Sequence, residues 1–260
     1  QVLEPIIPCK VPEKIKNNLE FKNVGFFYHN NVKNVINCVN FSIKPGEIVA
    51  LVGENGSGKS TIVKLLARLY DPQQGHIFLD GQDIKNFKTD DFRKKISVVF
   101  QDHIKYQLSA KENIFLGDIE QKDNTSKIIE AARQTDVDEK ISGFPSGYNT
   151  LLGKWFKNGE ELSIGQWQMV AISRAFFRDA EIVILDEPSS ALDPETEMII
   201  FSKLKKLMKG RAALIISHRY STVKMADKIL VLDKGHIIEQ GSHEELIKEN
   251  GKYAKLYKTQ

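Results

Sequence analysis

A glycine-rich stretch of nine residues constrains this chain more than any other feature of its sequence. It follows the apolar residues 48–52, precedes a helical pattern and fits the spacing G-x-x-x-x-G-K-[ST] of a phosphate-binding loop. Glycines let the backbone wrap closely around phosphate, and the N-terminus of the next helix adds partial positive charge. The pattern therefore predicts an α/β fold with a nucleotide site. The stretch consists of Gly53, Glu54, Asn55, Gly56, Ser57, Gly58, Lys59, Ser60 and Thr61.

Three side chains of this loop have predicted roles toward MgATP. Lys59 supplies a full positive charge to the β- and γ-phosphates. The Ser60 hydroxyl is placed to ligate Mg²⁺, and Thr61 can reach an oxygen of the α-phosphate. The alternative interpretation is a glycine-rich turn that merely caps a helix.

A second acidic element lies far along the chain, where a mostly apolar strand at residues 181–185 ends in Asp186 and Glu187. Open α/β sheets bind their ligands beyond the carboxyl ends of the strands, and successive side chains of a strand point in different directions. We predict that Asp186 holds Mg²⁺ or its water, and that Glu187 polarises the water that attacks the γ-phosphate. Alone, such a strand end is commonly the start of a solvated loop; its pairing with the phosphate loop favours the functional interpretation.

The order of apolar and polar segments predicts a mostly parallel sheet, covered by helices on its faces, behind a β-rich front part. Residues 102–178 lack long apolar strands and read as a helical insert, and residues 1–18, which contain three prolines, read as a linker. We expect strands at residues 19–28, 40–43, 47–52, 96–100, 181–185, 212–217 and 228–232, and helices at 59–69, 125–133, 165–178 and 195–209.

Composition narrows the classes of function. The 37 basic and 34 acidic residues give a net charge of +3 without a dense basic block, so we expect no nucleic-acid partner. No apolar run approaches the roughly 18 residues that span a bilayer. Cys9 and Cys38 are too few for a disulfide framework or a four-cysteine metal site, which fits a reducing, cytosolic setting.

A five-residue segment upstream of Asp186 carries a family resemblance. Leu162, Ser163, Ile164, Gly165 and Gln166 match the LSGGQ signature of ATP-binding cassette (ABC) proteins at four of five positions. From residue 19 onward the chain resembles the nucleotide-binding domain of this family. The resemblance implies an ABC ATPase domain at 19–260: a P-loop NTPase core with a mixed or parallel sheet, an N-terminal antiparallel β subdomain and a helical insert.

The same resemblance implies roles for further residues that occur in the family's order. Tyr28 would stack on adenine, and Gln101 would be the Q-loop glutamine, a ligand of Mg²⁺ that also takes part in catalysis. Residues 190–193 resemble the D-loop, and His218 the switch histidine that donates to the γ-phosphate or holds Glu187 and its water in place. Each has an alternative: Tyr28 as a core aromatic, Gln101 as a surface glutamine, His218 as a structural histidine.

The resemblance also implies a head-to-tail pair of domains. Ser163, Gly165 and Gln166 of one domain would contact the nucleotide held by the other's phosphate loop, with Ser163 as the N-cap of a helix aimed at phosphate. Ile164 stands where the family usually has glycine; it is β-branched and adds bulk there. We predict that catalysis tolerates it.

Residues 113–117 and 235–246 resemble the exporter branch of the family. That likeness implies a transmembrane domain fused upstream, a homodimer, and a place on the cytoplasmic face of the cell membrane. Residues 152–159 and 165–168 are similar to transporters of modified peptides such as lantibiotic exporters, which suggests a peptide as cargo. Trp155 and Phe156 fit either the core of the helical insert or a contact with the membrane partner.

Two other functions remain as alternatives. An ABC ATPase acting on DNA would carry a long coiled coil between the loop and the signature, whereas about a hundred residues without sustained heptads intervene here. One acting on ribosomes would carry two cassettes in its chain. A nucleotide-gated module that barely hydrolyses is conceivable because of Ile164, but Lys59, Asp186, Glu187 and His218 are all present.

Overall fold

The computed structural model describes residues 2–28, 34–100, 104–121, 124–155, 157–188, 198, 201–202, 204–205 and 208–258. The chain divides into two compact units, which we treat separately. The first unit comprises Gln1–Val98, Glu181–Glu187 and Lys205–Gln260, and the second comprises Val99–Ala180 and Pro188–Leu204.

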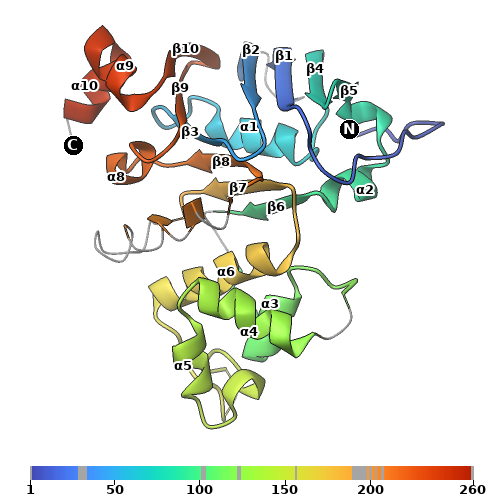
Figure 1. Ribbon diagram of the computed structural model, residues 1–260, viewed down its shortest axis with the longest axis vertical. Coiled ribbons are helices and arrows are strands. Elements are labelled where there is room, and N and C mark those ends of the chain that lie inside the picture. Colours follow the sequence, from blue (N-terminus) through green and yellow to red (C-terminus); the bar gives the residue numbers. More distant parts are fainter. Residues whose placement is uncertain are drawn as a thin grey trace. The chain divides into compact units, whose positions relative to one another are not determined.

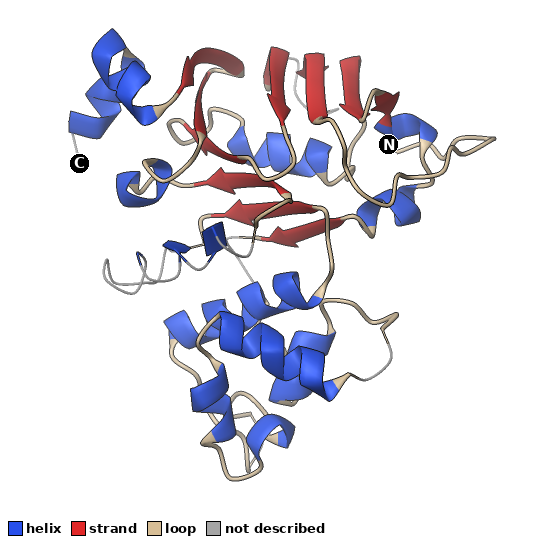
Figure 2. Cartoon of the chain, in the orientation of Figure 1, coloured by secondary structure: helices blue, strands red, loops and turns tan. Residues whose placement is uncertain are grey.

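Two β-sheets build the first unit (Figures 1 and 2). A four-stranded antiparallel sheet has the order β2-β1-β4-β5. A six-stranded sheet has the order β10-β9-β3-β8-β7-β6, in which β9, β3, β8 and β7 run parallel and β10 runs antiparallel to β9. The strands are β1 (Leu19–Phe26), β2 (Ile36–Ile43), β3 (Ile48–Val52), β4 (Gln74–Leu79), β5 (Gln82–Asp83), β6 (Ile96–Val99), β7 (Ile182–Asp186), β8 (Ala212–Ile216), β9 (Lys228–Asp233) and β10 (His236–Gly241).

Short helices accompany the sheets, and helices dominate the second unit. The first unit contains α1 (Lys59–Leu66), η1 (Ile84–Asn86), α2 (Thr89–Arg93), α8 (Tyr220–Val223), α9 (His243–Glu249) and α10 (Lys252–Lys258). The second contains α3 (Ala110–Phe115), α4 (Thr125–Gln134), α5 (Asp138–Ser142), η2 (Gly147–Asn149) and α6 (Ile164–Phe177).

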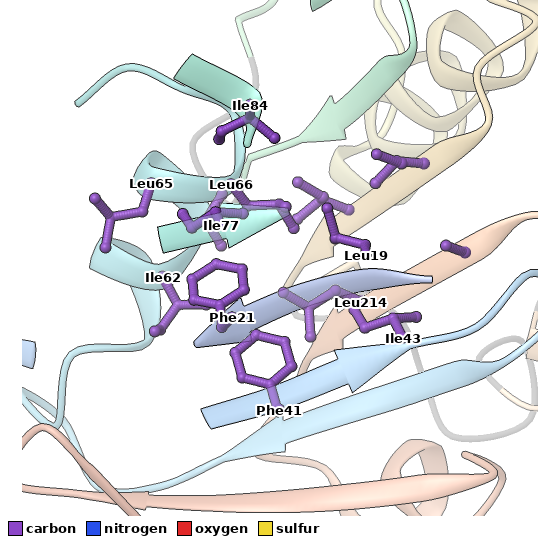
Figure 3. Packing of buried hydrophobic residues seen from close by; sticks show 14 of the residues in the cluster. Leu19, Phe21, Phe41, Ile43, Ile62, Leu65, Leu66, Ile77, Ile84 and Leu214 are labelled. Carbon is purple, nitrogen blue, oxygen red and sulfur yellow. The ribbon is translucent and has the colours of Figure 1, made fainter. Parts of the chain in front are cut away.

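The main core of the first unit lies where the two sheets and α1 meet (Figure 3). Every residue of β3, β7 and β8 is buried, so both faces of these strands are covered, which explains their mostly apolar sequences. Phe21 and Phe41 stack with ring centroids 4.4 Å apart, and the apolar face of α1 adds Ile62 and Leu65. This packing fixes the start of α1, and with it the phosphate loop, against the end of β3.

Helix α1 ends at Leu66 rather than at Leu69, where the sequence pattern placed its end. Arg68 adopts a left-handed backbone with φ 49°, its N–H donates to the Leu65 carbonyl, and the Leu69 N–H donates to the Lys64 carbonyl. These two bonds form the turn that closes a helix beyond its last regular residue. The Arg68 side chain is fully buried and donates to the Phe87 carbonyl over 2.6 Å, which holds the turn in place.

Residues 2–18 lie along the surface of the first unit. Val11 and Ile15 are buried in its core, the Cys9 N–H donates to the Asn86 carbonyl over 2.7 Å, and the Lys16 N–H donates to Asp80 over 2.9 Å. The segment that reads as a linker is therefore attached to the domain along much of its length. The boundary at residue 18 stays a prediction.

The second unit packs around α6, most of whose side chains are buried, as is expected for a helix enclosed by α3 and α4. Arg174 joins α6 to α3, since it donates to the carbonyl and to the side chain of Asn113. Burial lowers the pKa of Arg174 to about 10. Trp155 is 86% exposed, so its interpretation as a core residue of the insert is wrong. Phe156 lies outside the described residues.

Several elements escaped prediction. The sequence pattern does not predict strands β4, β5 and β10 or helices α9 and α10. Their own sequences are polar or short, so their periodicity is weak. The helix expected at residues 195–209 falls largely outside the described residues. Within the described part of the chain, no helix combines the length and apolar character that a bilayer crossing needs.

Candidate nucleotide site

The loop from Gly53 to Thr61 joins β3 to α1 and needs glycine at fixed points. A Cβ atom on Gly53 would lie 2.2 Å from the Leu232 carbonyl oxygen of β9, a distance no side chain tolerates. Gly58 has φ 112°, a left-handed backbone that favours glycine, directly before the first residue of α1. The two glycines therefore let the loop turn tightly against its neighbouring strand. Glu54, Asn55 and Gly56 lie exposed at its tip.

The side chain of Lys59 folds back onto the first residues of the phosphate loop. Its ammonium donates to the carbonyl oxygens of Gly53 at 2.8 Å and Glu54 at 3.0 Å. Burial lowers the pKa of Lys59, whereas the carboxylates of Glu187 and Asp186 act on it in the opposite direction. The ammonium thus lies within electrostatic reach of both predicted acidic residues.

Parallel pairing brings Asp186 and His218 to the edge of the sheet at which β3 ends. In the register, Leu51 of β3 and Asp186 of β7 both pair with Ile216 at the end of β8. The carboxyl ends of these neighbouring strands therefore meet, as the ligand edge of an α/β sheet requires. Asp186 is 8% exposed, and His218 follows β8 by two residues.

Glu187 and His218 are in contact at this edge. Nδ1 of His218 lies 3.2 Å from Oε1 of Glu187. Glu187 has φ 51°, an unfavourable backbone for a residue with a side chain, at a cost of about 1–3 kcal/mol. Its N–H donates to the Ile216 carbonyl over 2.9 Å, which fixes this conformation. Glu187 therefore combines an unfavourable backbone conformation with a contact between its carboxylate and His218.

A cavity of about 220 Å³ adjoins His218 and the phosphate loop. Ser217 and His218 line it together with Gly53, Glu54 and Asn55. Val52 and Leu256 complete the lining. Such a volume is small beside the roughly 300–1,000 Å³ of typical ligand pockets, so these walls enclose only part of a nucleotide.

Tyr28 lies next to the phosphate loop. Its hydroxyl is 3.2 Å from the Thr61 hydroxyl, and its ring meets the rings of Phe26 and Tyr70 edge to face. Lys64 places its ammonium 5.7 Å from the centroid of the Tyr28 ring. The structure thus brings Tyr28 to the site, and its role toward adenine stays a prediction.

The oxygen atoms at this edge fit Mg²⁺. Ser60 is exposed in the first turn of α1, and Asp186 supplies a carboxylate at the end of β7. Among the described residues there is no group of three or more His, Cys, Asp or Glu side chains that could hold a metal. Magnesium needs no such group, because it is commonly held by one or two protein oxygens together with substrate phosphates.

The signature segment begins α6 in the second unit. Ser163 is the N-cap: its hydroxyl accepts from the Gln166 N–H at 3.2 Å, and the Gln166 side chain accepts from the Ser163 N–H at 3.0 Å. Ile164 follows as the first helical residue, with 62% of its surface exposed, so its bulk faces outward and leaves the cap intact. Gly165 lies half-buried in the same first turn.

Two predicted elements lie outside the described residues, namely Gln101 and the segment 190–193. Conversely, the structure adds two residues that no motif indicated. Lys252 and Leu256 of α10 lie against the phosphate loop, although almost two hundred residues separate them from it in sequence. No pattern in the sequence indicates that these two residues lie near the loop.

The chain is similar to known proteins over most of its length. A family model described as "ABC transporter" matches residues 36–190. The chain is 45% identical over 96% of its length to an ATP-dependent lipid A-core flippase of Hahella chejuensis, and 42% identical over 92% to the subtilin transport ATP-binding protein SpaT of Bacillus subtilis. It covers 42% and 39% of those two proteins.

A solved structure of a bacterial Atm1-family ABC exporter with ATP bound matches 99% of the chain at 35% identity with a TM-score of 0.90, and the chain covers 44% of it. The predicted α/β ABC ATPase fold is thereby confirmed. Because the family model matches more than half of its residues, the chain belongs to the ABC transporter family.

Proposed function

We propose that this chain is the nucleotide-binding domain of an exporter and that it hydrolyses MgATP. One observation carries the proposal. The phosphate loop, Asp186 and the Glu187–His218 pair lie together at the carboxyl edge of neighbouring parallel strands. Phosphoryl transfer to water needs these elements: a cradle for phosphate, an oxygen ligand for magnesium and a group that directs water.

Binding of the nucleotide rests on the loop. Its backbone N–H groups and the start of α1 would hold the phosphates, Lys59 would neutralise them, and Tyr28 would meet the adenine. Ser60, Asp186 and Gln101 would hold Mg²⁺, which when bound neutralises charge on the phosphate oxygens.

Hydrolysis rests on Glu187 and His218. The Glu187 carboxylate would accept a proton from the attacking water, since it is fixed at the strand end by its own N–H bond. His218 would hold that carboxylate through the 3.2 Å contact and donate toward the γ-phosphate. The backbone strain at Glu187 supports a functional role, because such conformations cluster at active sites.

We propose that a second copy of the domain completes the site. Ser163 is exposed, and its hydroxyl uses a lone pair to accept from Gln166, so its proton is available for a phosphate oxygen. The start of α6 adds partial positive charge beside Gly165 and Gln166.

The proposed output is transport across a membrane. The chain spans about two fifths of the length of the relatives it matches, which leaves room in a homologous protein for a fused transmembrane domain. The cytoplasmic face of the cell membrane is the proposed location. Both relatives are transport proteins, which favours transport over action on DNA or ribosomes. A peptide is the proposed cargo, on the likeness of residues 152–159 and 165–168 to peptide exporters and of the chain to SpaT.

The test uses the protein at its full natural length. It should bind MgATP, release phosphate only when magnesium is present, and lose both properties when Lys59 is replaced by alanine. In sealed vesicles, a transported peptide should stimulate phosphate release, whereas DNA and ribosomes should not. Phosphate release that is unaffected by Lys59→Ala would refute the nucleotide site, and stimulation by DNA or ribosomes would refute the exporter.

A further inference from the structure

Lys252 of helix α10 forms an ion pair with the phosphate loop. The ammonium of Lys252 lies 3.2 Å from Oε1 of Glu54 in the loop and 2.9 Å from Oδ1 of Asp233 at the end of β9. Asp233 follows Leu232, whose carbonyl oxygen is the close neighbour of Gly53. Lys252 therefore joins the loop to the strand against which the loop turns.

Glu54 is held at two points. Its carboxylate meets Lys252, and its carbonyl oxygen accepts a hydrogen bond from the Lys59 ammonium over 3.0 Å. A displacement of Glu54 therefore moves one of the two carbonyl groups that position Lys59. The Glu54 side chain is also 62% exposed at the tip of the loop, where it adds negative charge close to the site for phosphate.

Contacts other than the Lys252 side chain also hold α10. Glu239 of β10 accepts hydrogen bonds from the backbone N–H groups of Lys252 and of Tyr253, the latter over 2.9 Å. Tyr253 is fully buried, and its hydroxyl lies 2.8 Å from Nδ1 of His243. A Cβ atom on Gly251 would lie 2.4 Å from Oε1 of Glu239, so the backbone before α10 packs closely against the Glu239 side chain. The Lys252 side chain is therefore available for a second task.

Helix α10 also contributes to the walls of the site. Leu256 lines the cavity that His218 and Gly53 share. A second cavity of about 380 Å³ is lined by Gly251, Lys252, Lys255, Leu256 and Glu54. Glu54 and Leu256 therefore line both cavities, and Lys252 lines the second.

We propose that Lys252 is a positioning residue of the phosphate loop, which acts through Glu54. The inference rests on the proposed function and adds a residue to it. With Lys252 present, the loop tip is held against β9 and the Glu54 charge is balanced. Without it, the Glu54 carboxylate repels the polyphosphate and the carbonyl that seats Lys59 loses its fixed position. Binding of MgATP weakens, whereas the Glu187–His218 pair is untouched.

The experiment is a double-mutant cycle in the protein at full natural length, with Lys252→Met, Glu54→Gln and their combination. Partly exposed ion pairs have modest effects, so we expect Lys252→Met to raise the Kd and KM for MgATP by about two- to fivefold, with kcat unchanged. In the Glu54→Gln background the same change should have almost no effect, and added salt should reduce the difference. Lys252→Arg should retain the wild-type KM.

Lys248→Met, on the exposed face of α9, is the matched control and should leave KM unchanged. The proposal is overturned if Lys252→Met leaves KM unchanged, or if its effect is the same with and without the Glu54 carboxylate. It is also overturned if kcat and Tm fall together in Lys252→Met, since that result means a structural role alone. A wild-type protein that binds no MgATP would refute the proposed function itself.

Discussion

Nδ1 of His218 lies 3.2 Å from Oε1 of Glu187, so two residues that are distant in sequence meet where the γ-phosphate is expected. From this contact we predict that Glu187→Gln lowers kcat by about 10²- to 10³-fold, because the amide cannot accept the proton of water. Glutamine keeps the shape of the side chain, so MgATP binding should persist and the closed dimer should accumulate. Phosphate release, nucleotide binding and size-exclusion chromatography provide the three measurements.

The control for that variant is Glu139→Gln on the exposed surface of α5, which should behave as wild type. If Glu187→Gln retains full turnover, Glu187 is not the base.

Ser163→Ala tests the signature against a built-in comparison. Ser109 begins α3 with the same capping box that Ser163 forms at α6, so both alanine variants lose a cap at a cost of about 0.5–2 kcal/mol. Only Ser163 is proposed to contact a nucleotide across the dimer. We expect both variants to lower Tm, and Ser163→Ala alone to reduce phosphate release per folded molecule. Equal turnover in the two variants would restrict Ser163 to a structural role.

Ile164→Gly tests whether the departure from the family signature limits catalysis. Ile164 is exposed in the first turn of α6 and leaves the hydrogen bonds of the Ser163 cap in place. We therefore expect turnover to change by less than about tenfold, which corresponds to about 1.4 kcal/mol of barrier. An increase of tenfold or more in steady-state phosphate release would show that Ile164 limits the rate of ATP hydrolysis.

Gly117→Ala should destabilise the second unit. A Cβ atom on Gly117 would lie 2.1 Å from the Arg174 carbonyl oxygen, so α3 and α6 must separate, at a cost of about 1–3 kcal/mol. Gly143→Ala is the matched control, because the nearest atom there is 3.4 Å away. Thermal unfolding should show a lower Tm for the first variant only. Similar Tm values for both would contradict the packing of α3 on α6.

The capping box of α3 predicts a pH dependence. Hydrogen bonds from the Ser109 hydroxyl and N–H lower the pKa of Glu112 below its usual 4.5. A carboxyl group with a depressed folded-state pKa stabilises the fold above its unfolded pKa, and the contribution is lost as pH falls through the folded value.

In urea unfolding, wild type should therefore exceed Glu112→Gln by less than about 1 kcal/mol near neutral pH, because this side chain is exposed. The two proteins should converge as pH falls through the lowered pKa of Glu112. A difference that stays constant across this range would mean that the carboxylate charge contributes nothing to the cap.

The sequence predicted those parts of the molecule in which local pattern and tertiary structure agree. Strands β3, β7 and β8 are continuous apolar runs because they are buried on both faces, and the motif of the phosphate loop contains its own geometric requirements. The family model and the solved exporter structure confirm the family and the α/β fold.

Other features depend on tertiary contacts that leave little trace in sequence. The end of α1 at Leu66 is set by Arg68, a residue with good helix propensity, whose buried guanidinium bonds to a distant carbonyl group. Likewise, nothing in the sequence distinguishes Lys252 from the other lysines. Its contact with the loop depends on the placement of α10 after β9 and β10. The individual roles of the site residues stay predictions.

The strand order of the six-stranded sheet has a consequence for the synthesis of this protein. Strand β3 ends in the phosphate loop, yet its sheet neighbours β8 and β9 begin at Ala212 and Lys228. During translation, β3 cannot form these pairings before residues 212–233 have been made, because its partners do not yet exist. The nucleotide site therefore takes its final form late in the synthesis of the domain, and pairing between segments so distant in sequence is slow.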